Sequence, residues 1–382
     1  MNLDKTLDDP TTQILVCCGS GGVGKTTMAA ALAVRAAERG RRVCVLTIDP
    51  ARRLAQSLGL TELDNTPRQV PDVGVDSGGA LFAMMLDMKR TFDEIVEQHA
   101  DPGRAEQILA NPFYQTLSSS FAGTQEYMAM EKLGQLHRQS DQTGDWDLVI
   151  VDTPPSRSAL DFLDAPERLG SFLDGRFIRL LMAPARAGGR AYMRVLGAGF
   201  SLVAGALTKI LGAQLLTDLQ TLIAGLDSIF GGFRQRAEET YALLQAPGTA
   251  FVVVAAPESD ALREAAYFVE RLQAERMPLA GLVLNRVHTS TAMDLSAERA
   301  AGAAEDLAER NEHVLTAALL RLHADTMRVI AREQHLLQRF SGAHPRVPVA
   351  VAPALAGDVH DLPGLRAVGA SLANSTPTWS RG

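Results

Sequence analysis

A glycine-rich loop near the N-terminus constrains the fold of this chain more than any other part of the sequence. The segment ILVCCGSGGVGKTTMAAALAV starts as an apolar run, continues with a glycine loop and ends in an alanine-rich helical pattern. It fits the pattern G-x-x-x-x-G-K-[ST], with Gly19, Gly24, Lys25 and Thr26 at the fixed positions. The sequence therefore predicts a P-loop, which needs a buried strand before it and a helix after it.

Each residue type in this loop contributes to phosphate binding in a particular way. Glycines let successive backbone N–H groups turn toward a phosphate without interference from a Cβ atom, and the helix N-terminus adds partial positive charge. We predict that the loop binds ATP, that Lys25 is catalytic and reaches the β- and γ-phosphates, and that the Thr26 hydroxyl ligates Mg²⁺. The predicted ATP-binding residues of the loop are Gly21, Gly22, Val23, Gly24, Lys25, Thr26 and Thr27.

Seven short apolar runs, separated by helical patterns, extend through most of the chain. Most are rich in Val, Ile and Leu without polar alternation, which is typical of parallel strands buried on both faces. We therefore predict an α/β fold with a doubly wound, mostly parallel sheet and right-handed crossovers. The runs are Ile14–Cys18, Val43–Ile48, Leu81–Leu86, Leu148–Val151, Phe251–Ala255, Gly281–Leu284 and Val347–Val351.

Two intervals between the runs are too long for simple crossovers. Residues 88–145 and 164–248 carry helical patterns, and we predict that they form a helical subdomain inserted into a single P-loop domain spanning residues 1–382. The middle of the second interval, Tyr192–Phe233, is rich in Gly, Ala and Leu. A third helical stretch, Met293–Phe340, is charged and predicted to lie at the surface. The polar tail 374–382 is predicted to be disordered.

Composition argues against several classes of function. The net charge of −7 and isoelectric point near 5.7 argue against a nucleic-acid-binding surface. Residues 1–12 are polar and lack the apolar segment of a secretory signal, so we expect a cytoplasmic protein. The three cysteines, Cys17, Cys18 and Cys44, lie in apolar runs and form no CxxC pair, which favours buried thiols over zinc or disulfides.

The most apolar part of the second interval, Val195–Leu216, is close in length to a membrane span. A bilayer core requires about 20 apolar residues, and here Lys209 interrupts the run, followed by Gln214. A helix that buries two faces, or one that offers an apolar surface to a partner, is favoured instead. Membrane contact is expected to be peripheral at most.

The GGxGK[ST]T form of the loop resembles that of the deviant Walker A ATPases, a group that includes ParA/MinD proteins, nitrogenase iron protein and the ArsA/guided-entry ATPases. The resemblance implies a nucleotide-sandwich dimer in which a lysine immediately before the Gly-Gly pair reaches into the partner's site. Here that position is Ser20, and Lys5 lies upstream of the strand. We therefore expect a heterodimer with a homologous lysine-bearing subunit.

Two further segments resemble the ArsA/guided-entry branch in particular. TIDPARRLAQSLGL resembles switch I, which implies that Asp49 orients the attacking water; a plain helix N-cap is the alternative. LVIVDTPPSRSALDFL resembles switch II, which implies that Asp152 holds Mg²⁺ through water. The segment departs from the branch at Arg157, where the family has glycine. Arg157 or Arg52 is an alternative source of the positive charge that Ser20 lacks.

The resemblance continues to about residue 370 and is strongest to actinobacterial anion-transporting ATPase-like proteins. GLVLNRV resembles the branch's VVNQ or VVNR stretch, which implies that Asn285 hydrogen-bonds adenine; a turn asparagine at a strand end is the alternative. The segment that begins at Pro353 aligns with the family's adenine loop, so Pro353 is also a predicted nucleotide contact.

Three functions fit these observations. The first is an ATPase that couples its nucleotide state to binding of a hydrophobic client protein through the helical subdomain. The second is an ATP-binding regulatory subunit with little activity of its own. The third is the energising subunit of an anion pump of the arsenite type, against which the predicted burial of all three cysteines argues. All three predict ATP and Mg²⁺ as cofactors.

Overall fold

The computed structural model divides into two compact units. The first comprises Met1–Met85, Gln139–Ala159 and Leu244–Gly382, and the second comprises Leu86–Arg138 and Leu160–Leu243. The residues that the structure describes are 1–48, 53–112, 114–115, 118, 125–154, 232 and 235–373.

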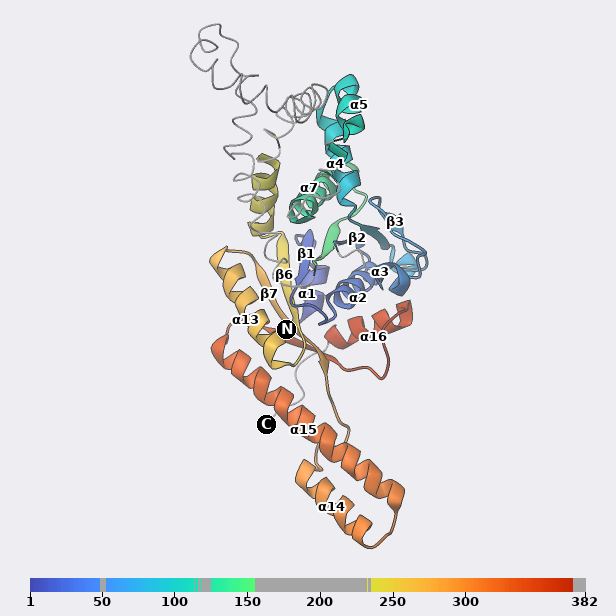
Figure 1. Ribbon diagram of the computed structural model, residues 1–382, viewed down its shortest axis with the longest axis vertical. Coiled ribbons are helices and arrows are strands. Elements are labelled where there is room, and N and C mark those ends of the chain that lie inside the picture. The colour runs from blue at the N-terminus through green and yellow to red at the C-terminus, as the bar shows by residue number, and fades with distance from the viewer. Residues whose placement is uncertain are drawn as a thin grey trace, which may run out of the picture. The chain divides into compact units, whose positions relative to one another are not determined.

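An eight-stranded sheet forms the centre of the first unit (Figure 1). The strand order is β3-β4-β2-β5-β1-β6-β7-β8, and every neighbouring pair is parallel except β3 and β4. The predicted α/β fold with a mostly parallel sheet is therefore confirmed. The strands are β1 (Ile14–Cys18), β2 (Arg42–Thr47), β3 (Arg68–Gln69), β4 (Ala80–Met85), β5 (Leu148–Asp152), β6 (Thr249–Ala255), β7 (Leu279–Val287) and β8 (Val349–Pro353).

The seven apolar runs correspond to seven of these strands, with ends that differ by a few residues. The eighth strand, β3, was missed by the sequence analysis. It contains two residues and pairs antiparallel with β4 at the edge of the sheet. Two residues are too few to show a periodic pattern, so the sequence does not predict this strand.

The sheet is buried on both faces, which explains the unbroken apolar runs. In β1, Leu15 and Cys17 belong to a hydrophobic cluster with α2 (Lys25–Glu38). Ile14 and Val16 lie on the opposite face, because successive side chains alternate across a strand, and both are 1% exposed. A strand covered on both sides has no solvent-facing position, and polar alternation is therefore absent.

Helices of the first unit cover this sheet (Figure 1). α2 packs against β1, β2 and α16, while α13 packs against β6 and β7. α1 packs on α2, where Asp4 accepts two hydrogen bonds of 2.6 Å from the guanidinium of Arg35. The remaining elements of this unit are α1 (Leu3–Asp8), α3 (Arg53–Ser57), the 3-10 helix η1 (Val75–Ser77), α13 (Ser259–Ala274), α14 (Ala297–Glu309), α15 (Val314–Ala343) and α16 (Leu362–Ala373).

The predicted helical stretch Met293–Phe340 folds as a hairpin of two helices, α14 and α15, which pack against each other (Figure 1). Between them, Asn311 and His313 have φ values of 54° and 46°. The left-handed conformation ends one helix and starts the next, because it cannot continue a right-handed helix.

The described part of the second unit is helical. It contains α4 (Met88–His99), α5 (Pro102–Ala110), most of α7 (Gln125–Thr143) and a helical segment at 235–243. A carboxylate of α7, Glu131, is buried in this unit. It accepts a hydrogen bond from the Arg236 guanidinium of the helical segment at 2.8 Å and one from the Tyr127 hydroxyl at 3.0 Å. A buried charge requires such a partner, so this ion pair joins the two helices.

Several predictions fall on residues outside the described ranges. They include Val195–Leu216 and, except for Gly232, all of Tyr192–Phe233, together with the predicted disordered tail 374–382. Within the described ranges, no helix combines the length and the apolar character needed to cross a membrane.

Arg41 joins three segments at the amino-terminal edge of the sheet. Its guanidinium donates to the carbonyl oxygens of Leu7, Asp9, Thr12 and Asp147, at 2.8 to 3.0 Å, and forms an ion pair with the Asp147 carboxylate. The bonds to the carbonyl oxygens of Leu7 and Thr12 are buried, so water cannot readily replace the guanidinium there.

We expect Arg41→Ala to lower the free energy of unfolding by about 2–4 kcal/mol, since it leaves two buried carbonyl oxygens without a donor. The matched control is the neighbouring Arg42→Ala, because Arg42 is exposed; its loss is expected to stay within about 1 kcal/mol. Urea denaturation followed by circular dichroism measures both. Equal losses in the two variants would show that Arg41 is not the link described here.

Candidate nucleotide-binding site

The predicted P-loop leaves the sheet at the carboxyl end of β1. There Gly19 has a φ of 148°, and a Cβ atom on it would lie 2.1 Å from the carbonyl oxygen of Val254 in β6. Any side chain would push β1 and β6 apart, so only glycine fits. Because β1 lies between β5 and β6, the loop occupies the middle of the edge where ligands bind in open parallel sheets.

The other end of the loop is held by β7. Gly24 has a φ of 91° and precedes α2, and a Cβ atom on it would lie 2.4 Å from Nδ2 of Asn285. This Nδ2 donates a 2.8 Å hydrogen bond to the carbonyl oxygen of Val23, and Asn285 Oδ1 accepts from the backbone N–H of Arg286 at 3.0 Å. Asn285 therefore positions the loop; its contact with adenine stays a prediction.

Lys25 folds back over the loop from the first position of α2. Its Nζ donates a 2.8 Å hydrogen bond to the carbonyl oxygen of Ser20, and the residue is 6% exposed. Gly21 and Gly22 lie exposed between these two residues. An ammonium group and a helix N-terminus thus lie beside the exposed backbone of one glycine loop, an arrangement that suits a phosphate group.

Ser20 occupies the position that the family resemblance assigns to a lysine. The residue is 8% exposed, and its hydroxyl oxygen has no hydrogen-bond partner among the residues that the structure describes. A hydroxyl at this position carries no charge and is too short to reach another subunit.

A buried carboxylate lies beside the start of α2. Asp152, at the end of β5, is 0% exposed. Its Oδ2 accepts a 2.7 Å hydrogen bond from the Thr26 hydroxyl and a 2.9 Å hydrogen bond from the Thr47 hydroxyl. The next residue, Thr153, donates its hydroxyl to the Cys17 carbonyl oxygen at 2.9 Å. Strand β2 and helix α2 therefore meet at the carboxylate that ends β5, and β1 is joined to the residue that follows it.

The structure brings Thr26 and Asp152 together, and their chemistry suits Mg²⁺. Both offer oxygen atoms, the ligands that this hard cation prefers. Among the described residues, no group of three or more His, Cys, Asp or Glu side chains could hold a metal ion. Mg²⁺ usually binds through one or two protein groups together with phosphate and water.

Sequence reasoning missed Thr47, whose hydroxyl donates a second hydrogen bond to Oδ2 of Asp152. Thr47 is 1% exposed and ends β2, immediately before Ile48. The available signal is a lone hydroxyl residue at the carboxyl end of an otherwise apolar run. Such a residue lies at the edge where the loop of a parallel sheet binds its ligand.

The remaining predicted site residues have different outcomes. Pro353 lies at the end of β8, beside Val287 of β7. Asp49, Arg52 and Arg157 lie outside the described ranges, so their predicted roles stay predictions.

The three cysteines are buried and free. Burial raises the pKa of Cys18 to about 12 and that of Cys17 well above its usual value, with the Asp152 carboxylate raising the latter further. Both thiols are therefore neutral at physiological pH. Since thiolates are the form that binds soft metals, this region is poorly suited to bind a metalloid.

The sheet, the loop and the buried aspartate define a P-loop protein. The sequence profile of a family described as Anion-transporting ATPase matches residues 12–306, which is more than half of the chain. The chain therefore belongs to the anion-transporting ATPase family.

Several curated relatives are similar to this chain. ATPase GET3 of Podospora anserina is 26% identical over 287 residues, covering 75% of this chain and 76% of that protein. ATPase GET3 of Malassezia globosa is 31% identical over 167 residues, 44% of this chain and 46% of that protein. An Escherichia coli arsenical pump-driving ATPase is 27% identical over 158 residues, 41% of this chain and 26% of that protein. Two of the relatives, from Malassezia globosa and Schizosaccharomyces pombe, are thus matched over only 46% of their length.

We expect Thr47→Val to lower the free energy of unfolding by about 1.5–3 kcal/mol, because it removes a hydrogen bond to a buried carboxylate. Thr47→Ser keeps the hydroxyl and loses only a methyl group, about 0.8 kcal/mol. Urea denaturation of the two variants compares these losses. A serine variant as unstable as the valine variant would show that packing, not the hydrogen bond, dominates at this position.

We also expect Cys17 and Cys18 to resist Ellman's reagent in the folded protein at every pH from neutral to about 9. An ordinary thiol has a pKa of about 8.5 and reacts faster as the pH rises through that value. Here the raised pKa values keep the thiols protonated throughout this range. The same protein in urea is the control and should release the full signal. Rapid reaction of the folded protein would contradict the burial of these thiols.

Proposed function

We propose that this chain binds and hydrolyses Mg-ATP. The observation that carries the proposal is the loop from Gly19 to Thr27 at the centre of the sheet edge, with Thr26 hydrogen-bonded to the buried Asp152. The family to which the chain belongs supports this activity. The relatives named above are ATPases by name.

In the proposed site, each residue has a defined task. Backbone N–H groups of Gly21–Thr27 bind phosphate oxygens, and the Lys25 ammonium exchanges the Ser20 carbonyl for the β- and γ-phosphates. Thr26 and Asp152 hold Mg²⁺, which supplies charge neutralisation on the phosphates when bound. Asn285 holds the loop through its hydrogen bond to the Val23 carbonyl oxygen. It also hydrogen-bonds one edge of the adenine. Asp49 orients the attacking water.

Ser20 bears on how this ATPase works with a partner. A positioned cation on the developing phosphoryl charge contributes on the order of 10³–10⁵ in rate. With serine at this position, a homodimer across the nucleotide face lacks that cation. We therefore propose that the nucleotide face pairs with a homologous subunit that carries the lysine, so that this chain's own site is the one completed by a lysine. Arg157 or Arg52 is the alternative source of charge.

The proposed output is a change in binding of a hydrophobic client protein by the helical subdomain. The inserted intervals 88–145 and 164–248, and the Gly/Ala/Leu-rich composition of Tyr192–Phe233, motivate this part of the proposal. Its test is binding of a hydrophobic peptide in the presence of ADP and of a non-hydrolysable ATP analogue. Equal binding in both states would rule out coupling. A regulatory subunit that binds ATP but turns it over slowly is the second candidate, and Ser20 favours it.

An anion pump subunit is a third candidate, since one relative is an arsenical pump-driving ATPase. The neutral, buried Cys17 and Cys18 argue against activation by a metalloid at these thiols. Stimulation of the ATPase rate by arsenite would restore this candidate. We also propose that this chain is more similar to actinobacterial anion-transporting ATPase-like proteins than to other members of the family.

We expect the purified chain alone to hydrolyse Mg-ATP slowly, and Lys25→Ala to lose nucleotide binding. Ser20→Lys should raise turnover by at least about tenfold, which is well below the full contribution of a positioned cation. Steady-state phosphate release and nucleotide-binding titration measure these effects.

The matched control is Ser20→Met, which has a side chain of similar length without the charge. A gain in the lysine variant alone identifies the missing cation as the defect. Fast turnover by the unaltered chain, with no gain in Ser20→Lys, would overturn the heterodimer proposal. Arg157 and Arg52 would then be the residues to replace.

A further inference from the structure

One residue of strand β7, Arg286, has a backbone conformation that is foreign to strands. Its φ is 62°, in the left-handed region, where a Cβ atom comes too close to the following carbonyl oxygen. Such a conformation costs free energy and persists only where the surrounding structure holds it. In the described part of the chain, the other non-glycine residues with positive φ lie outside helices and strands: Asp72, Arg276, Asn311 and His313.

A bulge in β7 accompanies this conformation. Leu284 pairs with Val351 of β8, and Val287 pairs with Pro353. Between these two pairs β7 therefore has one residue more than β8. Bulges of this kind re-aim a side chain and are frequent next to active sites.

The bulge separates two neighbouring side chains at the carboxyl end of β7. Asn285 shares a face of the strand with Val283, which belongs to the hydrophobic cluster around α2. Extended backbone would place Arg286 on the opposite face, with the buried Leu284. The left-handed conformation keeps the guanidinium out of that apolar layer, and Arg286 is exposed.

Hydrogen bonds on both sides hold Arg286 in place. On one side, Asn285 Oδ1 accepts from the Arg286 N–H at 3.0 Å, and Asn285 Nδ2 donates to the Val23 carbonyl oxygen at 2.8 Å. On the other side, His288 donates its backbone N–H to Glu333 Oε2 at 2.9 Å, and its ring Nδ1 lies 2.6 Å from Oε1. The segment is therefore fixed between the P-loop and α15.

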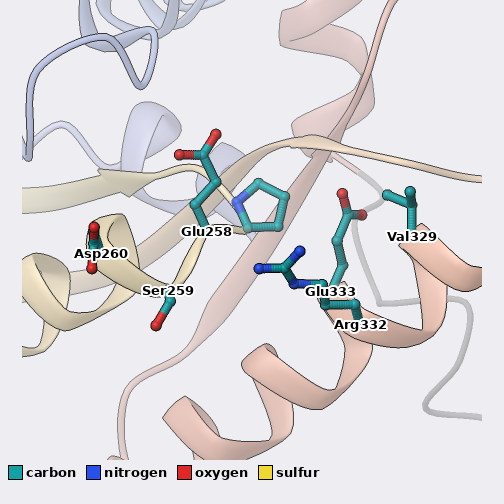
Figure 2. A pocket seen from close by; sticks show the side chains of 7 residues that line it. Glu258, Ser259, Asp260, Val329, Arg332 and Glu333 are labelled. Atoms are coloured by element: carbon teal, nitrogen blue, oxygen red, sulfur yellow. The ribbon is translucent and has the colours of Figure 1, made fainter.

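The Arg286 guanidinium has no hydrogen bond or ion pair with the residues that the structure describes. Glu333 is engaged by His288 and lines a cleft of about 460 Å³ (Figure 2). Figure 2 shows Glu258, from the segment that follows β6, at the same cleft. Glu258 is thus the alternative partner for the guanidinium within the protein.

We propose that the Arg286 guanidinium binds a phosphate group of the nucleotide held by the P-loop, an inference that rests on the ATP binding proposed above. Asn285 contacts this loop directly, and the next Cα atom is only about 3.8 Å away, so a long arginine side chain reaches ligand phosphates. A guanidinium suits this target because it is always charged and presents several N–H donors in one plane. The contact contributes to nucleotide affinity, so it does not depend on a partner subunit.

Glycine is the substitution that separates conformation from charge. Arg286→Gly keeps the left-handed backbone without the cost of a Cβ atom, so it should raise the urea midpoint of the nucleotide-free protein. It also removes the guanidinium, so it should weaken binding of a non-hydrolysable Mg-ATP analogue at least about tenfold, the loss of one charge-assisted hydrogen bond. We therefore expect a more stable protein that binds nucleotide less tightly.

The matched control is Arg276→Gly, beyond the amino end of the same strand. Arg276 is exposed and has a φ of 56°, but it follows α13, where the Met277 N–H ends the helix by donating to the Leu272 carbonyl oxygen at 2.8 Å. This variant should also raise the urea midpoint and leave nucleotide binding unchanged. Arg286→Lys keeps a positive charge and should lose less affinity than Arg286→Gly.

Inorganic tripolyphosphate tests which part of the nucleotide Arg286 contacts. Its dissociation constant, measured by displacement of a fluorescent ATP analogue, should rise in Arg286→Gly by about the same factor as that of Mg-ATP. Added salt should weaken binding more in the unaltered chain than in this variant, since screening acts on a contact that the variant lacks. A loss for Mg-ATP without a loss for tripolyphosphate would overturn the phosphate contact.

The remaining outcomes also decide the matter. Unchanged Mg-ATP binding in Arg286→Gly, with binding lost in Lys25→Ala, would overturn this proposal and leave the proposed ATPase standing. An unaltered chain that binds no nucleotide would overturn both. An equal loss of affinity in Arg276→Gly would trace the effect to the backbone of β7 instead. Equal falls in the urea midpoint of Arg286→Gly and Glu258→Gln would assign the guanidinium to an ion pair with Glu258.

Discussion

The buried carboxylate of Asp152 is the interaction on which the centre of this molecule depends. It receives hydrogen bonds from Thr26 on α2 and Thr47 on β2, while β5 places it at 0% exposure beside β1. Both donors bind Oδ2, so this one oxygen links α2 and β2 to the end of β5. The same carboxylate is the predicted outer ligand of Mg²⁺. Asp152 therefore has a role in the fold and a predicted role in binding Mg²⁺.

The loop next to this carboxylate is held by neighbours that leave no room for a Cβ atom at two of its glycines. Gly19 approaches Val254 of β6, and Gly24 approaches Asn285 of β7, in each case nearer than a Cβ atom allows. The strands on that side of β1 thus determine the path of the loop, and Asn285 holds it through Val23. A change in β7 is expected to alter phosphate binding even though β7 does not supply the P-loop itself.

The proposed nucleotide contacts depend on two different kinds of local structure. The P-loop follows a local sequence pattern, and Ser20 leaves the nucleotide face without the cation that the family resemblance leads one to expect. Arg286 depends instead on a bulge in β7 and on a left-handed backbone, held between the P-loop and Glu333. The first feature bears on the rate of hydrolysis, and the second bears on the affinity for nucleotide.

By itself, the sequence determined the α/β class, the seven apolar strands, the P-loop and the candidate ligands Thr26 and Asp152. It could do so because parallel strands and phosphate loops impose local patterns. Only the tertiary structure revealed β3, the hydrogen bond from Thr47 to Asp152 and that from Asn285 to Val23, since these join residues far apart in the chain. The left-handed conformation of Arg286 was also decided there, because the hydrogen bonds that hold it reach Val23 and Glu333, which are distant in the sequence.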